Sequence, residues 1–370
     1  MPKTPFLCHF VDSVSDNPRR NHSTDFREFL SNKLKLLPNN DNHLDKCVLI
    51  LSTSLDFEAD VVSIELIRRG TDYVRLNAED VPHILSMASS VDQDSDKEYK
   101  IKLGSRIINL SDISAVWLRD FDYGLIHPHS NDLNQIFIFQ QWRDALQILY
   151  STLECGWINS PDATYRTNNR VTQLSHAKLS GFNIPSTLIT NDPERSRSFY
   201  RDHDSDIILK VLHHHDIEAN NKVYSIYSHR VTDKDLSKFD DLIYAPCILQ
   251  ERIHNCSELR VTVVKDKVFS VKLGSNTVAS RYCDMHRIPL SRLPKRPIQL
   301  EKEFELHCIK LVESFGLDYG AIDFVMDEEG KPFFMEVNPT GDWLWIERET
   351  KLPITKAMVE LIEHKVNDSA

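Results

Sequence analysis

Two apolar strands joined by a short turn, at residues 318–338, constrain the fold of this chain more than any other segment. The turn at residues 329–330 predicts a two-residue hairpin loop, because its second residue is glycine. That loop places Asp323 directly opposite Glu336. Asn338 lies on the same face, since side chains alternate along a strand. The sequence therefore predicts two acids and one amide together on one side of a hairpin.

Facing carboxylates need a counter-charge, because like charges opposite each other destabilise a sheet. A divalent cation supplies that charge, and carboxylate and amide oxygens are the ligands that Mg²⁺ prefers. We therefore predict a magnesium site at Asp323, Glu336 and Asn338. A solvated face on which the two acids tolerate each other is the alternative. The apolar residues around both acids make us favour the metal.

Charge and composition limit the partners of the chain. Its net charge is −11, which argues against nucleic-acid and membrane partners, because both require a basic face. No apolar run approaches the ~18 residues of a membrane span, and the first residues lack a secretory signal. The 7 cysteines include no Cys-x-x-Cys pair, so neither a disulfide framework nor a zinc site is indicated. These features predict a cytoplasmic protein.

Several cations lie where they could meet phosphate, although the sequence contains no Gly-rich phosphate loop. Lys210 lies within an apolar strand, where an ammonium group needs a partner, either a phosphate or a buried acid. Arg260 and Lys272 belong to a second hairpin, on which we expect them to share the polar face. Two cations near a metal–carboxylate cluster suit phosphate or acyl-phosphate charge. An exposed hairpin face is the alternative for this pair.

The order of elements predicts an α/β fold. From residue 46 the chain alternates strand, helix and strand, which favours a parallel sheet covered by helices. Further blocks of mixed strands and helices begin near residues 159 and 246. The polar segment 13–45 is typical of a linker.

Taken in order, these segments resemble the ATP-grasp superfamily, and more narrowly the microviridin-type (graspetide) peptide maturases. The most specific stretch is FFMEVNPTGDWLWIE at 333–347, close to the E-x-N-P-x-G-x-W-x-W-I-E pattern of those maturases. Residues 159–161, 181–191 and 259–264 support the resemblance. It implies a parallel-sheet pre-ATP-grasp domain and two α+β lobes that clamp ATP. The expected parts are a leader-like segment 1–12, linker 13–45, pre-ATP-grasp domain 46–158, N-lobe 159–245 and C-lobe 246–370.

The resemblance also implies an ADP-forming ligase that uses ATP and Mg²⁺. Such an enzyme activates a carboxylate of a ribosomal peptide as an acyl-phosphate and forms ester or amide links, including macrocycles. Arg260 and Lys272 would stabilise the acyl-phosphate and the tetrahedral intermediate. Asp323, Glu336 and Asn338 would ligate Mg²⁺. The residues expected to contact the nucleotide, in chain order, are Arg170, Lys210, Gln250, Glu251, Ile253 and Glu258.

Substrate contacts are expected where the chain departs from the family pattern or continues it beyond the metal ligands. The family's paired arginines appear here as the single Arg119, and its Asp-Trp-Arg appears as Asp284-Met-His, followed by Arg287. Thr340 and Gly341 follow the last predicted metal ligand. Arg170 stands where the family usually has lysine, which keeps the charge but changes the donor geometry.

The first residues resemble the leader motif P-F-F-A-R-F-L-E of microviridin precursors. The match includes Pro5, Phe6 and Phe10, and the two phenylalanines form one apolar face at helical spacing. In the family this motif is a short helix of the precursor, which docks on the maturase and activates it. We hypothesise that this chain contains its own leader in cis, which raises its effective concentration. A chance match in a disordered tail is the alternative.

Other functions remain open on the sequence alone. A stand-alone carboxylate–amine ligase could join an amino acid or small amine to a peptide or small molecule. A catalytically inactive module that binds nucleotide or peptide is the non-enzymatic alternative. The family tendency is towards homodimers, and the peptide substrate is external, because no ring-forming core peptide is evident in the chain.

Overall fold

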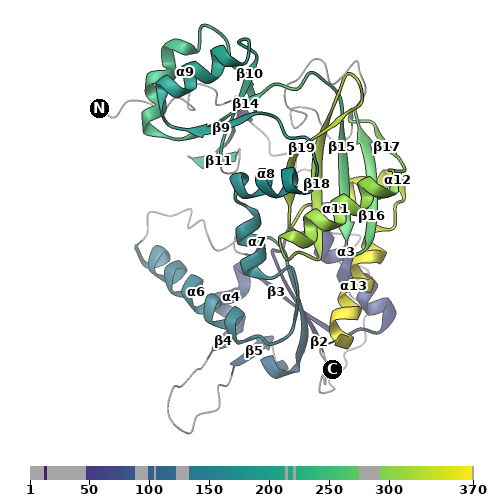
Figure 1. Ribbon diagram of the computed structural model, residues 1–370. Helices are drawn as coiled ribbons and strands as arrows, with labels where there is room; N and C mark the ends of the chain where they lie inside the picture. The colour runs from purple at the N-terminus through teal and green to yellow at the C-terminus, as the bar shows by residue number, and fades with distance from the viewer. Residues whose placement is uncertain are drawn as a thin grey trace.

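The structure is a computed structural model whose described residues form a parallel-sheet domain, a small lobe and a large lobe (Figure 1). The parallel-sheet domain lies at the bottom of that view and the two lobes lie above it. Among the helices that the structure describes, none is long and apolar enough to cross a membrane. The structure describes residues 12–14, 47–87, 99–103, 106–121, 133–212, 216–219, 222–274 and 292–368.

The parallel-sheet domain contains four parallel strands in the order β3-β2-β7-β8. The central strand β2 is buried at every position, as expected for a sheet covered on both faces. Between β2 and β3, helix α3 begins at the N-cap Asp56 and ends at Gly70, which adopts φ 76°. The predicted strand–helix–strand opening is thus confirmed. The bounds are β2 (Cys47–Ser52), α3 (Phe57–Arg69), β3 (Tyr73–Asn77), β7 (Ile113–Leu118) and β8 (Gly156–Ile158).

A small antiparallel sheet, β4-β5-β6, and the long helix α6 complete this domain. Apolar residues at helical spacing over 132–154 predict this helix, with Gly156 as its stop. The helix ends at Thr152, and Gly156 instead begins β8. The bounds are α4 (Val81–Ile84), β4 (Leu85–Met87), β5 (Tyr99–Leu103), β6 (Arg106–Asn109) and α6 (Leu133–Thr152), with the 3-10 turns η2 (Ala78–Asp80) and η3 (Leu110–Asp112).

The small lobe, hereafter the N-lobe, is an antiparallel sheet of order β13-β10-β14-β9 covered by helix α9. Strand β14 was expected to open the C-lobe, but it pairs with β9 and β10, so the N-lobe sheet extends to Glu251. Helix α9 was missed, although Asp192 caps it and Pro193 occupies its first turn. The bounds are β9 (Thr187–Thr190), α9 (Pro193–Asp202), β10 (Ile207–Lys210), β13 (His229–Arg230), η4 (Leu236–Tyr244) and β14 (Cys247–Glu251).

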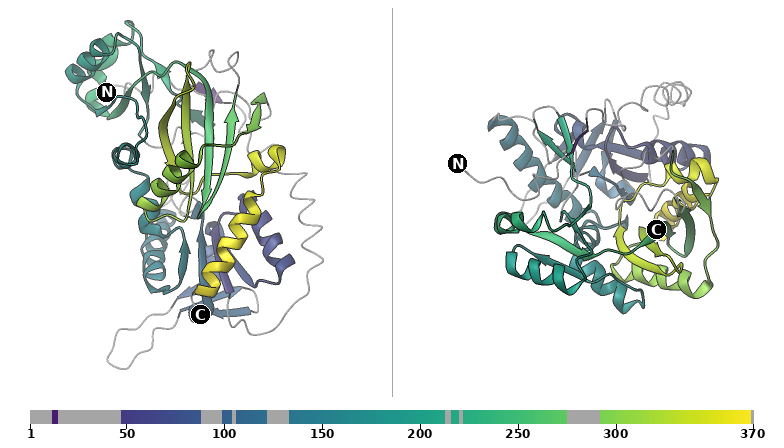
Figure 2. Two further views of the ribbon diagram at one scale, coloured as in Figure 1. Left: turned by 45° about the vertical axis from the view of Figure 1, so that its right-hand side comes forward. Right: turned by 90° about the horizontal axis from the view of Figure 1, so that it is seen from above.

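The large lobe, hereafter the C-lobe, is a five-stranded antiparallel sheet of order β17-β16-β15-β18-β19. Helices α7, α8 and α11 contribute to the apolar core on one face of this sheet. Helix α13 lies between the sheet and the parallel-sheet domain, where it packs against α3, β7 and β15 (Figure 2). The bounds are α7 (Pro161–Thr167), α8 (Arg170–Leu179), β15 (Asn255–Val264), β16 (Lys267–Leu273), β17 (Lys295–Pro297), α11 (Lys302–Ser314), β18 (Tyr319–Asp327), β19 (Pro332–Asn338), α12 (Leu344–Thr350) and α13 (Ile354–Asp368).

In the β18–β19 hairpin, Asp323 and Glu336 pair as predicted, but the loop between the strands differs from the predicted one. Its loop is one residue longer than expected, because Asp327 pairs with Lys331 through a backbone hydrogen bond of 3.0 Å. A bulge between the pairs Phe324–Phe334 and Asp323–Glu336 then shifts the register back by one residue. Asp323 therefore faces Glu336 as predicted.

A fourth antiparallel sheet contains the chain's first described residues. Strand β1 (Asp12–Val14) pairs with β12 (Lys222–Ser225), which pairs with β11 (Asp216–Ala219). The segment ending at residue 12 was expected to be helical, but its last residue belongs to this strand. The leader-like residues Pro5, Phe6 and Phe10 lie outside the described residues.

Candidate active site

The acid pair lies on the partly exposed face of the C-lobe sheet. The side chains of Asp323 and Glu336 are 28% and 32% exposed. Their neighbours Ile322 and Val337 are buried in the apolar core of the opposite face. Because side chains alternate along β18 and β19, the two acids lie on the polar face of the sheet and their apolar neighbours lie on the other face.

Each acid has an arginine partner. Arg260 on β15 lies opposite Asp323, and its Nη1 donates to Asp323 Oδ2 at 2.6 Å. Arg170, the first residue of α8, forms an ion pair with Glu336. Burial lowers the pKa of Arg260 and the adjacent Asp323 carboxylate raises it, with a net upward shift. Arg260 thus stays charged beside the acid pair.

Asn338 completes the predicted metal set at the end of β19. Its Oδ1 accepts a hydrogen bond from the backbone N–H of Thr340 at 3.0 Å, which orients the amide. Within the described ranges, no group of three or more His, Cys, Asp or Glu side chains could hold a metal ion. The set of two carboxylates and one amide fits the oxygen preference of Mg²⁺. Magnesium binding at Asp323, Glu336 and Asn338 stays a prediction.

Lys272 does not share a face with Arg260, contrary to the expectation from the hairpin pattern. In the β15–β16 ladder, Arg260 pairs with Val271, whereas Lys272 pairs with Leu259. Paired residues project to the same side of a sheet, so the two cations point to opposite faces. Lys272 is exposed. The alternation of residues within each strand was predicted correctly, but the register between the strands was not.

The N-lobe contributes a cation that approaches the acid-bearing hairpin. Lys210 ends β10, and its Nζ donates to Gln250 Oε1 at 2.9 Å and lies 4.0 Å from the sulfur of Met335. Gln250 in turn donates to Thr187 Oγ1 at 2.9 Å. The sequence predicted a phosphate or a buried acid as the partner of Lys210. In the structure, the amide oxygen of Gln250 is a partner. The contact with Met335 on β19 brings the two lobes together at this point.

A cavity of about 280 Å³ opens beside Arg170. It lies between the first turn of α8 and the N-lobe strand β9. Arg170 joins this cavity to the acid pair through its contact with Glu336. The residues that line it are Asn168, Asn169, Arg170, Val171, Ile189 and Leu212.

The predicted nucleotide contacts between residues 250 and 258 lie at the connection between the lobes. Residues 252–254 join β14 of the N-lobe sheet to β15 of the C-lobe sheet, and Ile253 is half-buried there. Glu251 Oε2 accepts from the backbone N–H of Ser186 at 3.1 Å. Glu258 lies two residues before Arg260, so it projects to the same face. These positions fit a nucleotide between the lobes, and the individual contacts stay predictions.

Arg119 cannot contact an external substrate in this structure, contrary to expectation. Its side chain is 2% exposed, and its Nε donates to Asp56 Oδ2 at 3.0 Å. Asp342 also pairs with it, at 2.8 Å. This role of Asp56 could not be predicted from the sequence, since an acid before a helix usually caps it. The other predicted substrate residues Asp284 and Arg287 lie outside the described residues.

Gly341 lies where the backbone approaches the sheet too closely for any side chain. A Cβ at this position would lie 2.6 Å from Ala321 Cβ and 2.9 Å from Arg260 Nη2. Thr340 donates its hydroxyl to Asp120 Oδ1 at 3.0 Å. Both residues, predicted to contact substrate, shape the loop between Asn338 and the parallel-sheet domain. Their contact with a substrate stays a prediction.

Comparisons with known proteins agree with this arrangement. Residues 47–164 match the family model of the MvdD pre-ATP grasp domain. A RiPP-associated ATP-grasp ligase from Chryseobacterium gregarium, solved with ADP and a leader and core peptide, is 25% identical, with a TM-score of 0.75 over 87% of this chain and 97% of its own. The chain has the ATP-grasp fold.

Two macrocyclases from Microcystis aeruginosa MRC are similar to this ATP-grasp protein. MdnC, solved with its precursor peptide MdnA, is 24% identical with a TM-score of 0.75, over 86% of this chain and 99% of its own. MdnB is 25% identical with a TM-score of 0.70, over 86% of this chain and 99% of its own. A search of curated proteins finds no similar sequence. The parallel-sheet domain is hereafter called the pre-ATP-grasp domain.

Proposed function

We propose that this ATP-grasp protein is an ADP-forming ligase that activates a carboxylate of a ribosomal peptide and joins it to an alcohol or amine. The observation that supports this most directly is the face shared by Asp323, Glu336 and Arg260, which Lys210 approaches from the N-lobe. Anionic and cationic groups of this kind suit a nucleotide triphosphate and its metal. A peptide is the substrate class because the ligase from C. gregarium was solved with leader and core peptides.

The proposed reaction has two steps. A carboxylate oxygen of the peptide attacks the γ-phosphorus of ATP, and ADP leaves as the acyl-phosphate forms. A hydroxyl or amine of the peptide then attacks the acyl carbon, loses its proton, and phosphate leaves as the ester or amide forms. Bound magnesium, held by Asp323, Glu336 and Asn338, would supply neutralisation of phosphate charge.

The chain's own residues act by positioning charge rather than by covalent chemistry. Lys210 offers an ammonium at the N-lobe side of the site. Arg260 is buried, and among the described residues its Nε has no hydrogen-bond partner. The positive charge of its guanidinium, which lies beside Asp323, would stabilise the acyl-phosphate and the tetrahedral intermediate, which gains negative charge as it forms.

The N-terminal segment is proposed to act as a leader in cis. The pairing of β1 with β12 anchors Asp12, the last residue of the leader-like segment, on the sheet β1-β12-β11. Deletion of residues 1–42 should then lower turnover, and added peptide of residues 2–12 should restore it. Unchanged turnover after the deletion rejects the cis leader and leaves the ligase proposal intact. We further propose a cytoplasmic location, where ATP and magnesium are supplied, and a homodimer.

Mass spectrometry of candidate peptides tests the ligase proposal. Incubation with ATP and Mg²⁺ should release ADP and lower the peptide mass by one water for each link. A gain in mass equal to an added amine identifies the alternative, a stand-alone carboxylate–amine ligase. Absence of ADP release with every candidate peptide contradicts both, and favours a module that only binds nucleotide or peptide.

A further inference from the structure

Arg119 lies at the centre of a buried charge cluster that joins the pre-ATP-grasp domain to the C-lobe. On its own domain it donates from Nε to Asp56 Oδ2 at 3.0 Å. Across the interface it donates from Nη1 to the backbone carbonyl of Thr340 at 2.6 Å and from Nη2 to Asp342 Oδ1 at 2.8 Å. The guanidinium thus contacts both ends of residues 340–342, in the loop that follows β19.

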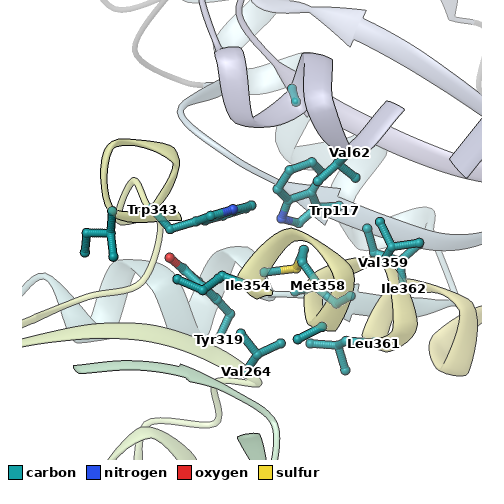
Figure 3. Packing of buried hydrophobic residues seen from close by; sticks show 14 of the residues in the cluster. Val62, Trp117, Val264, Tyr319, Trp343, Ile354, Met358, Val359, Leu361 and Ile362 are labelled. Atoms are coloured by element: carbon teal, nitrogen blue, oxygen red, sulfur yellow. The ribbon is translucent and has the colours of Figure 1, made fainter. Parts of the chain in front are cut away.

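A second acid of the pre-ATP-grasp domain contacts the residues that follow. Glu58 Oε1 accepts from the backbone N–H groups of Trp343 and Leu344, both at 3.1 Å. Trp343 is fully buried against Trp117, with 6.0 Å between ring centroids (Figure 3). Its ring also lies 5.3 Å from the Arg119 guanidinium, a cation–π distance. Packing and charge therefore hold the segment 340–344 against the pre-ATP-grasp domain.

The same segment contacts the candidate active site from its other side. The N–H of Thr340 donates to Asn338 Oδ1 at 3.0 Å, and the carbonyl of Asp342 accepts from Arg260 Nη2 at 3.3 Å. One residue that Arg119 contacts thus orients a predicted metal ligand. Another contacts the arginine that pairs with Asp323. Thr340 alone therefore connects Arg119 to Asn338, and Asp342 alone connects it to Arg260.

The charge cluster lies at the carboxyl ends of the parallel strands of the pre-ATP-grasp domain. Open parallel sheets usually bind ligands beyond the carboxyl ends of their strands. Arg119 follows the carboxyl end of β7, and Asp56 follows that of β2. Here Thr340 and Asp342 of the chain itself contact Arg119, so part of the C-lobe lies beyond this end of the parallel sheet.

We propose that Arg119 is a positioning residue that fixes residues 340–342, and through them the geometry of Asn338 and Arg260 at the magnesium–nucleotide site. This inference rests on the proposed function. It assigns to the pre-ATP-grasp domain a direct part in building the metal site. Groups that orient a metal ligand typically change metal affinity by about 10–100-fold when removed.

The test uses the full-length protein with the variants Arg119→Gln and Asp342→Ala. Isothermal titration calorimetry measures the affinity for a non-hydrolysable ATP analogue with and without Mg²⁺. The gain in affinity from Mg²⁺ should fall by roughly 10-fold or more in Arg119→Gln and by less in Asp342→Ala. The affinity without Mg²⁺ should stay within about 2-fold, because neither residue is predicted to touch the nucleotide.

Arg75→Gln is the matched control. Arg75 is a second arginine of the pre-ATP-grasp domain and is half-buried. It pairs with Asp60 and donates to the carbonyl of Thr53 at 2.5 Å, and its partners do not include residues 340–344. If Arg75→Gln loses as much of the Mg²⁺-dependent increase in nucleotide affinity as Arg119→Gln does, the effect is general destabilisation and the proposal is overturned.

Other outcomes are also decisive. The proposal is overturned if Arg119→Gln folds and Mg²⁺ raises its affinity for the ATP analogue as much as it does in the wild type. If that variant does not fold, Asp342→Ala decides in the same way, because its side chain is 46% exposed and its loss is tolerable to the core. A wild-type protein without any gain from Mg²⁺ contradicts the proposed function itself, which distinguishes that failure from failure of the inference.

Discussion

Gly341 is the residue whose replacement most directly tests the tight packing beside Arg260. An alanine Cβ would lie 2.9 Å from Arg260 Nη2 and 2.6 Å from Ala321, so the loop or the guanidinium must move. We expect Gly341→Ala to lower turnover by roughly 100-fold, the effect of a misplacement of about 1 Å. Steady-state kinetics of ADP release provides the measurement.

Gly70→Ala is the control for that substitution. Gly70 adopts φ 76°, which strains alanine, but no atom lies within 4 Å of the new Cβ. It should lose about 1–2 kcal/mol of stability and keep wild-type turnover. Equal turnover of Gly341→Ala and wild type would show that the close approach to Arg260 has no catalytic consequence.

The raised pKa of the Glu58 carboxyl predicts that the stability of the protein depends on pH. Burial, followed by the charge of Asp342, raises its pKa from 4.5 to about 7, although Arg119 opposes the shift. The folded state therefore binds more protons than the unfolded state between these values, so the contribution of Glu58 to stability falls as pH rises from about 4.5 to 7.

Glu58→Gln removes this titration. Relative to wild type, the variant should gain stability on the order of 2–3 kcal/mol between pH 5 and pH 8, from the 1.36 kcal/mol that each pKa unit represents. Urea unfolding of both proteins at pH 5, 6, 7 and 8 measures the difference. A difference that stays constant over this range contradicts the raised pKa.

At the scale of the elements, strands and helices with a strong hydrophobic pattern could be predicted from the sequence. The register in which neighbouring strands pair could not. The buried strand β2 and the helix cap at Gly70 follow from local sequence. The register of β15 and β16 depends on how the turn closes, and a shift of one residue reverses every side chain. Lys272 was therefore assigned to the wrong face.

The facing acids of β18 and β19 were predicted correctly because two departures from the expected hairpin cancel. The loop is one residue longer, and the bulge beside Asp323 restores the register. No sequence pattern that we used predicts the bulge. The charge cluster at Arg119 was also unpredictable, because Asp56 and Arg119 are far apart in sequence and meet only in the folded sheet.

Asn159 joins three elements and provides a test at this scale. Its Oδ1 accepts from the N–H groups of Asp318 and Tyr319, at 2.9 and 3.1 Å, and its Nδ2 donates to the carbonyls of Tyr319 and Pro339, both at 2.9 Å. Truncation leaves buried polar groups without partners, at ~1–3 kcal/mol for each group. Asn159→Ala should therefore lower the unfolding free energy by about 3 kcal/mol or more.

Asn183→Ala is the matched control. Asn183 is half-buried, and its side chain donates to the carbonyl of Pro332 at 3.3 Å. Its loss should cost about 1 kcal/mol or less in thermal or urea unfolding. Equal costs for both variants would mean that Asn159 does not connect β8 to β18 and to the loop after β19.

At the scale of the whole molecule, the pre-ATP-grasp domain and the C-lobe pack into one unit. Helix α13 packs between the pre-ATP-grasp domain and the C-lobe sheet, and the apolar core at their interface contains residues from both. Two tryptophans and one tyrosine, Trp117, Trp343 and Tyr319, meet in this core (Figure 3). The domain is therefore fixed against the loop after β19, and the site is built from three parts of the chain.

The magnesium dependence of nucleotide affinity in Asp323→Asn and Glu336→Gln tests the central claim most directly. Calorimetry with a non-hydrolysable ATP analogue should give a clear gain in affinity from Mg²⁺ for the wild type. Each variant should lose most of that gain, about 10-fold or more, because a carboxylate ligand is neutralised. A gain of wild-type size in both variants would contradict the assignment of these acids to the metal.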